Sequence, residues 1–182
     1  MANITKLSTP YFVDGSTQLN ASVLNPIIAK INEVIDTVNS GSTPVVQPVV
    51  PTITLNTSTK KVTLSATSGL TIKYSTNGGT PTTSYSSAID VSNGATIKAI
   101  STNGTQSSSV PKVTITYDEE TGKISFATSE AGTIRYTTNG SNPTSSSTSY
   151  SAAITPVSGT TYKVAVYSGS TLVSEIATIQ IA

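Results

Sequence analysis

The chain has 182 residues, a net charge of +1, and charged side chains at only 10% of its positions. This length allows about one to three small domains with real hydrophobic cores, and without a basic stripe nucleic acid is not an expected partner. The sequence contains no Cys and no His, which removes disulfides, thiolate sites, and the commonest general base and metal ligand. We therefore expect no enzymatic activity and no cofactor.

The sequence shows neither a secretion signal nor a membrane-spanning segment. The N-terminal stretch MANITKLSTPYFVDGS lacks the apolar core of a signal peptide, and no apolar run approaches membrane-spanning length. We expect no membrane association. We also expect the protein to remain in the compartment where it is made, or to leave it as part of a larger assembly.

Residues 1–40 contain an expected amphipathic helix that would serve as an anchor or oligomerisation segment. Asn25-Pro26 predicts the helix start and Ser40-Gly41 its end. Apolar side chains recur there with spacings of 4, 3, 4 and 3, as in a coiled-coil seam; they are Leu24, Ile28, Ile31, Ile35 and Val38. Ile27 and Val34 widen this stripe on one side. These five seam residues form the predicted assembly interface.

Two interpretations of this seam remain open. It either packs on another protein surface or on the β part of its own chain, or it joins copies of the chain. Isolated helices of ~12–15 residues are marginal, so the stripe needs a partner of some kind. If copies of the chain associate, Ile at both core positions favours a trimer.

The next segment, residues 41–51, is rich in Pro, Ser and Gly and predicts a semi-stiff linker. Its three prolines argue against a central β-strand. A β-like arm that pairs with a neighbour is the alternative.

From residue 52 onward the pattern is of β type and is duplicated. TIKYSTNGGTPTT begins at Thr71 and TIRYTTNGSNPTS at Thr133, and YSSAI and YSAAI follow them. We expect two domains, residues 52–110 and 111–182, each able to fold by itself. Residues 113–117 could belong to either repeat or be shared by both.

Each repeated phrase predicts a strand, an Asn-Gly hairpin turn at positive φ, and a second short strand. The four repeated tyrosines suit the rim of a thin core, because they combine an apolar ring with a hydroxyl group; they are Tyr74, Tyr85, Tyr136 and Tyr150.

These phrases resemble the small immunoglobulin-like module at the C-terminus of chitobiases and β-hexosaminidases. The resemblance implies a mainly β fold: an N-terminal α-helical anchor, a Pro-rich linker and two tandem Ig-like β-sandwich domains. The module is not the catalytic part of those enzymes, so the resemblance implies no catalytic residues.

The segment FVDGSTQLNASVLNPIIAKINEVID is similar to the leading segments of tailed-phage virion proteins. That similarity implies a structural protein of a bacteriophage particle, assembled in the host cytoplasm, with capsid or tail proteins as its partners. A head fibre or capsid-decorating protein is the expectation. A tail-fibre component and a carbohydrate-binding module of a secreted bacterial protein are the alternatives.

The polar residues offer few candidate sites. The one cluster of acids, Asp118, Glu119 and Glu120, precedes Thr121-Gly122-Lys123 and is typical of a solvated hairpin turn, so we expect no metal site there. Contact with host-surface glycans would require exposed aromatic rings. Four tyrosines outside the repeated phrase are free for that role: Tyr11, Tyr117, Tyr162 and Tyr167.

Overall fold

The computed structural model describes residues 21–39 and 45–182. The chain divides into two compact units, Met1–Val45 and Val46–Ala182. We describe each unit by itself, as the N-terminal unit and the β unit.

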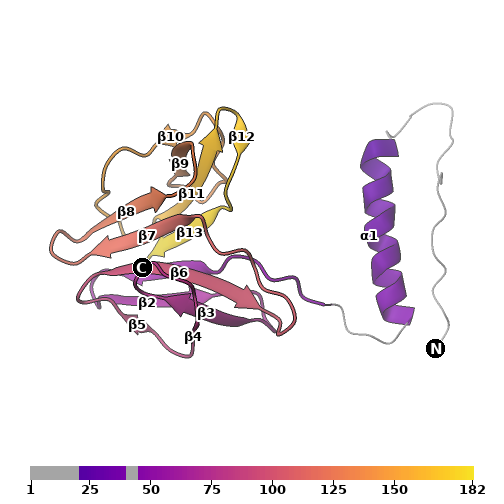
Figure 1. Cartoon of the computed structure of the whole chain (residues 1–182), viewed down its shortest axis with the longest axis horizontal. Helices are drawn as coiled ribbons and strands as arrows, with labels where there is room; N and C mark the ends of the chain where they lie inside the picture. Colours follow the sequence, from indigo (N-terminus) through magenta and orange to yellow (C-terminus); the bar gives the residue numbers. More distant parts are fainter. Residues whose placement is uncertain (1–20, 40–44) are drawn as a thin grey trace. The chain divides into compact units, whose positions relative to one another are not determined.

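In the N-terminal unit, helix α1 spans Ala21–Asn39 (Figure 1). Its end agrees with the predicted stop at Ser40-Gly41. The predicted start at Asn25-Pro26 is wrong, since the helix begins one turn earlier. Pro26 then lies in the second turn, where its missing N–H removes the one hydrogen bond that would reach the carbonyl of Ser22.

The β unit contains thirteen strands within residues 46–182. They are β1 (Thr52–Asn56), β2 (Lys61–Ser65), β3 (Thr71–Ser75), β4 (Thr83–Ser84), β5 (Ile89–Asp90), β6 (Ala95–Thr102), β7 (Val113–Asp118), β8 (Lys123–Thr128), β9 (Thr133–Thr137), β10 (Thr148–Ser149), β11 (Thr161–Ser168), β12 (Thr171–Leu172) and β13 (Ala177–Ile181). The mainly β fold, with Ig-like modules behind one N-terminal helix, is thereby confirmed.

The strands form two sheets. One runs β10-β9-β11-β13-β1-β2-β5, with β12 paired to β11, and the other runs β4-β3-β6-β7-β8. Along most strands, buried Ile, Val and Leu alternate with more exposed Thr, Ser and Lys. This period of two places one face of each strand in the core.

Strand β7 belongs to both repeats. It pairs antiparallel with β6 of the first repeat, where Ile97 lies opposite Ile115, and with β8 of the second repeat along its whole length. Figure 1 shows β7 between these two strands. The question left open for residues 113–117 is thus answered in favour of a shared strand, and the domain boundary at residue 110 stays a prediction.

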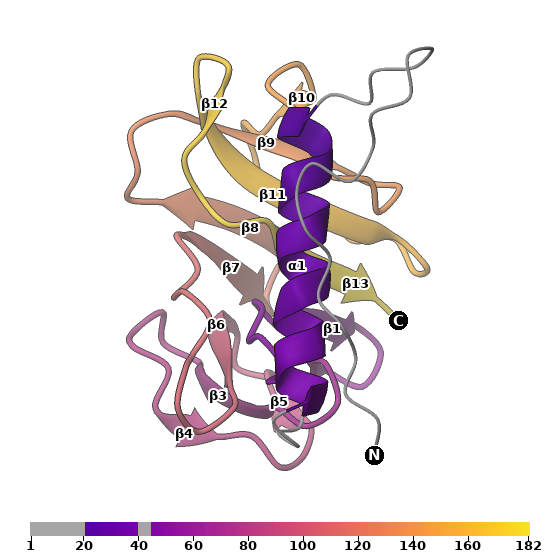
Figure 2. The ribbon, with the colours of Figure 1, turned by 90° about the vertical axis from the view of Figure 1, so that its right-hand side faces the viewer.

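The ends of the β unit meet in the other sheet. The last strand, β13, lies parallel to the first strand, β1, with Ile53 opposite Ile179 (Figure 2). Ala182 also donates its backbone N–H to the carbonyl of Leu55 at 2.9 Å. Each sheet therefore contains strands of both repeats, which differs from the expectation that each repeat folds by itself.

A single hydrophobic core runs through both repeats. It includes Leu55 and Val62 from the first, Ile124 and Val166 from the second, and Ile115 from the shared strand. The repeated tyrosines pack against this core while remaining partly exposed, as their amphipathic character predicts.

The Asn-Gly pairs do not form two-residue hairpins. Strand β3 ends at Ser75 and β4 begins only at Thr83. Between them Asn77 forms a parallel bridge to Thr96 on β6, and the Gly78 N–H donates to the Thr96 carbonyl at 2.9 Å. The second repeat does the same with Asn139 and Thr161. The predicted positive φ is confirmed for both glycines, whereas the predicted hairpin is wrong, because the chain continues beside the neighbouring strand.

Part of the predicted linker belongs to the β unit, which begins at Val46. The buried Ser101 hydroxyl donates to the Val49 carbonyl at 2.6 Å, and the Asn103 amide donates to the Val46 carbonyl at 3.1 Å. Pro51 is buried in the core. Residues 46–51 therefore form a strap held on the first repeat, whereas residues 41–44 of the predicted linker lie outside the described residues.

Candidate functional site

The strongest candidate for a functional surface is an apolar face of α1. Four of its side chains are exposed: Ile27 by 50%, Ile31 by 40%, Val34 by 54% and Val38 by 50%. We call these four the helix stripe. Exposed large apolar groups that gather on one face mark an interaction site more often than scattered ones do.

The five predicted interface residues divide between two environments. Ile28 and Ile35 are only 8% exposed, so they are already covered within the single chain. Ile31 and Val38 lie in the helix stripe. The side chain of Leu24 lies outside the described part of the chain. Two of the five predicted interface residues therefore expose little surface, although Ile35 still contributes to the lining of an open hollow on the helix.

The two residues that replace them, Ile27 and Val34, had a signal in the sequence. The helix stripe has spacings of 4, 3 and 4 along the chain, which is the spacing of core positions in a coiled coil. The predicted seam and the helix stripe thus overlap on one wide apolar face. The spacing alone does not distinguish the side of this face that is buried within the chain from the side that is exposed.

The surface between the stripe residues is hollowed. An open apolar hollow of about 560 Å³ is lined by Ile27, Ile31, Val34, Ile35 and the stem of Lys30. In helix association, side chains of one helix enter such hollows on the next. The hollow and the 4-3-4 spacing are both features of helix–helix contact surfaces.

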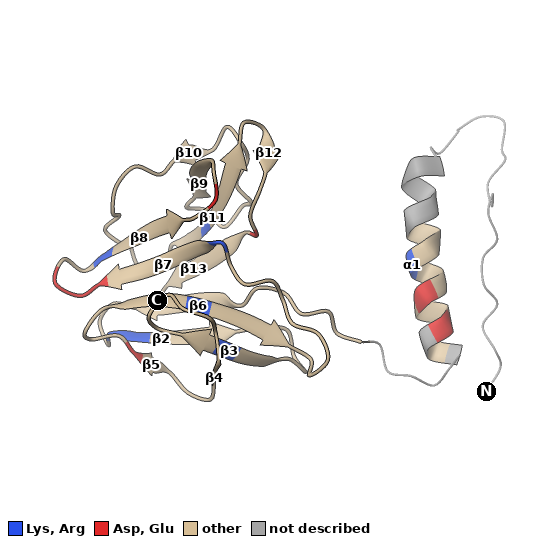
Figure 3. Cartoon of the chain, in the orientation of Figure 1, with Lys and Arg blue, Asp and Glu red and all other residues tan. Residues whose placement is uncertain are grey.

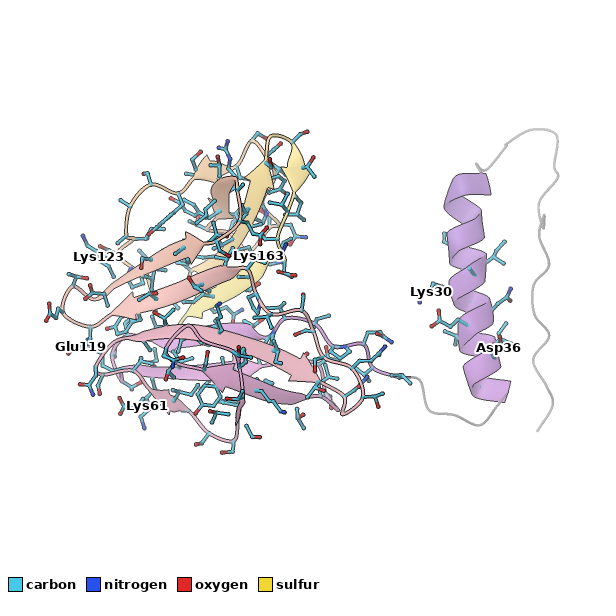
Figure 4. The ribbon with its side chains drawn as sticks, viewed as in Figure 1. Lys30, Asp36, Lys61, Glu119, Lys123 and Lys163 are labelled. Carbon is cyan, nitrogen blue, oxygen red and sulfur yellow. The ribbon has the colours of Figure 1, made fainter. Side chains whose placement is uncertain are left out.

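The charged groups of α1 have their own contacts. The ammonium group of Lys30 lies 2.6 Å from Glu33 Oε2 in an exposed pair one turn apart, an arrangement worth ~0–1 kcal/mol. Lys30 and Asp36 are labelled in Figure 4. The stripe itself carries no charge, so burying it does not incur the free-energy cost of desolvating an unpaired ion.

The acidic cluster lies where the sequence predicts it, in the turn between β7 and β8 (Figure 3). The Asp118 carboxylate accepts a hydrogen bond from the Thr121 N–H at 3.0 Å. That bond holds the pKa of Asp118 below its ordinary value. The carboxylate therefore has a structural role in shaping the turn.

The tyrosines do not offer an exposed stacking surface in the described residues. Tyr117 and Tyr162 are buried at 3% exposure. Tyr167 is half-buried, and its hydroxyl donates to the Pro143 carbonyl at 2.7 Å. Tyr11 lies outside the described residues. Residues 45–182 therefore offer no exposed aromatic ring on which a glycan could stack.

One further tyrosine contact was missed by sequence reasoning. Lys60 donates from its ammonium group to the Tyr117 hydroxyl at 2.8 Å, which raises the pKa of Lys60. Lys60 precedes β2 and adopts a φ of +54°, which is uncommon for a residue with a side chain. The pair joins the first repeat to the shared strand.

Within the described residues, no helix is long and apolar enough to cross a membrane. The chain matches no curated protein and no solved structure.

Two family models match the β unit. Residues 51–114 match the chitobiase/beta-hexosaminidase C-terminal domain, which confirms the resemblance for the first repeat. Residues 113–181 match the family described as Fn3 associated. The two matches overlap at the start of β7, the strand that the repeats share. The β unit is therefore similar to two small-domain families, one in each repeat.

Proposed function

We propose that the chain is a non-enzymatic structural component of a bacteriophage particle, either a head fibre or a capsid-decorating protein. Its N-terminal unit attaches it to other virion proteins and joins copies of the chain. The β unit is displayed outward, where it decorates the particle or contacts the host surface.

The observation that carries this proposal is the helix stripe. The four apolar side chains at coiled-coil spacing are 40–54% exposed. Because they are already half buried, covering each one gains about half of the ~1.5–3 kcal/mol that full burial of an exposed side chain provides. Such a surface is costly to leave in water. The β unit has one continuous core and is suited to be a rigid element on the particle surface. The resemblance of the N-terminal segment to virion proteins supports a phage particle as the site of attachment.

The experiment is a test of incorporation. A phage that carries the gene with a C-terminal tag would be grown, purified on a density gradient and labelled with an antibody against the tag. Label on the head in electron micrographs supports the proposal, and label on the tail supports the tail-fibre alternative. Particles without label and without the chain by mass spectrometry would overturn it.

One observation favours a second candidate function. The match of residues 51–114 to a module of chitobiases and β-hexosaminidases supports a carbohydrate-binding role in a secreted bacterial protein. The β unit alone would be passed over immobilised chitin and host cell-wall glycans. Retention that free sugar competes away supports this role, and flow-through equal to that of an unrelated β-protein counts against it.

A further inference from the structure

The chain contains four Asn-Gly pairs, at Asn77, Asn93, Asn103 and Asn139. This dipeptide is chemically reactive, because glycine lets its backbone nitrogen approach the preceding side chain without a Cβ in the way. Attack at the Asn Cγ forms a cyclic imide and releases ammonia. Water then opens the imide to Asp or to an isoaspartyl residue. A hydrogen-bonded Asn side chain must first be released, so the fold selects which pair reacts.

Two of the pairs are held by the sheet. Asn77 Oδ1 accepts from the Gly79 N–H at 3.0 Å, and the Gly78 N–H is bound to β6. Asn139 Oδ1 accepts from the Ser141 N–H at 3.1 Å, and the Gly140 N–H donates to the Thr161 carbonyl. In both pairs the side chain and the attacking nitrogen are engaged in separate hydrogen bonds.

The third pair is held by the strap and its own loop. Asn103 Oδ1 accepts from the N–H groups of Thr105 and Gln106, at 3.0 and 2.8 Å. The Asn103 amide nitrogen donates to Val46. This side chain thus has three hydrogen bonds to break before its carbon can be attacked.

Asn93 differs from the other three. It is exposed in the turn between β5 and β6, and its side chain makes no hydrogen bond with any residue in the described part of the chain. Only the Gly94 N–H is engaged, in a local turn bond to the Val91 carbonyl at 3.0 Å. We infer that Asn93 is a deamidation site of the folded protein, with Gly94 as the attacking residue.

In the first step, the Gly94 amide proton passes to a solvent base and the Gly94 nitrogen bonds to Asn93 Cγ. The Cγ–Nδ2 bond then breaks as Nδ2 takes a proton from solvent and leaves as ammonia. Hydrolysis with one water then creates a carboxylate. No oxidant or cofactor takes part.

The new carboxylate would enter an already acidic environment. Asn93 lines an open hollow of about 560 Å³ together with Asp118, Glu119 and Glu120 of the β7–β8 turn. Glu119 is labelled in this turn in Figure 4. A negative charge there meets like charges, and an isoaspartyl residue also lengthens the backbone of the turn. Deamidation therefore loosens the contact between these two turns.

The test uses the full chain, incubated in mildly alkaline buffer and sampled over time by peptide mass spectrometry. We expect Asn93 to convert at least about fivefold faster than each of the other three, because each of those must release at least one more ordinary hydrogen bond. In urea the four rates should converge. Equal rates in the folded chain, or faster conversion at another pair, would overturn the inference.

Two variants make the assignment specific. Asn93→Ser copies the second repeat, where Ser158 precedes Gly159, and Asn93→Gln keeps the amide on a longer side chain. Both should lack the main acidic species that the parent protein accumulates on ion-exchange chromatography. If either variant accumulates that species at the parent rate, Asn93 is not its source.

Discussion

The glycine of each repeated Asn-Gly pair occupies a backbone conformation that other residues resist. Gly78 has a φ of +75° and Gly140 a φ of +77°. A Cβ at Gly78 would lie 3.0 Å from the Thr96 methyl group, whereas a Cβ at Gly140 would lie 3.6 Å from Thr161. The same repeated residue thus has a tighter environment in the first repeat.

We predict that Gly78→Ala destabilises the β unit more than Gly140→Ala does. In both variants the free energy of unfolding should fall by about 1–2 kcal/mol, because alanine resists the left-handed backbone conformation. It should fall further in Gly78→Ala because of the close contact with the Thr96 methyl group. Gly69→Ala is the matched control, since Gly69 has a φ of +89° and a Cβ there would meet nothing within 4 Å. Urea denaturation measures all three. Equal losses for Gly78 and Gly69 would show that the methyl contact does not matter.

The turn carboxylates give the β unit an acid-sensitive contribution to stability. Hydrogen bonds from Ser92 lower the pKa of Asp90, and the Thr121 N–H lowers the pKa of Asp118. The folded state therefore binds these protons less readily than the unfolded chain. The stabilisation is present above the ordinary carboxyl pKa and is lost as the pH falls through the lowered values.

We predict that Asp118→Asn reduces this pH dependence. The parent free energy of unfolding should fall below about pH 4, and the variant should fall less, because its amide cannot be protonated there. Glu120→Gln is the control in the same turn. Thermal unfolding from neutral to acid pH measures the difference. Identical pH profiles for the parent and Asp118→Asn would contradict the assigned role of the hydrogen bond.

At the scale of elements, the strap of residues 46–51 shows how a segment that resembles a linker becomes part of a fold. Its carbonyls are bound by Ser101 and Asn103, which follow it by more than fifty positions in the sequence. Pro-rich backbone cannot satisfy its own carbonyls, so side chains of the first repeat supply the donors.

We predict that Ser101→Ala releases this strap. The free energy of unfolding should fall by about 1 kcal/mol, the typical net contribution of one hydrogen bond. Residues 46–50 should also become more accessible to proteases. Thr71→Val is the control, because it removes an exposed hydroxyl bound to Thr102 without touching the strap. Limited proteolysis followed by mass spectrometry identifies the cleaved bonds. Cleavage that is unchanged by Ser101→Ala would show that the strap is held by other contacts.

The sequence predicts the elements better than their connections. The period-two pattern and the repeated phrase identify the strands around Tyr74 and Tyr136, because strand character depends on local alternation. The pairing of β13 with β1 depends on residues more than a hundred positions apart, which no local pattern contains. The candidate site divides similarly: the spacing predicts the apolar face of α1, whereas the burial of Ile28 and Ile35 depends on tertiary contacts.

At the scale of the whole molecule, the β unit closes on itself. The shared strand β7 joins the repeats in one sheet, and the β13–β1 pair joins them in the other. Because the core is continuous, neither repeat keeps a complete set of strand partners without the other. This arrangement favours a single rigid body over two domains that move independently.

We predict a single unfolding transition for the β unit, residues 46–182. Leu55→Ala in the first repeat and Ile124→Ala in the second both empty a fully buried site. Each should lower the free energy of unfolding of that one transition by about 2–5 kcal/mol. Calorimetry would contradict the shared core if it showed two transitions, with each substitution moving only that of its own repeat.

If the N-terminal unit joins copies of the chain through the helix stripe, disrupting the stripe must lower the mass of the protein in solution. Light scattering of the full chain, of residues 46–182 and of an Ile31→Asp/Val34→Asp variant measures that mass. Both substitutions place a charge on the exposed stripe and spare the buried Ile28 and Ile35. Ala29→Asp is the charged control, because Ala29 is exposed on the same helix and lies outside the stripe and its hollow. We predict an oligomer, with a trimer expected from the Ile-rich seam, that becomes a monomer in the stripe variant and in residues 46–182 but persists in Ala29→Asp. A monomeric full chain, or a stripe variant with the mass of the parent oligomer, would contradict assembly through the stripe.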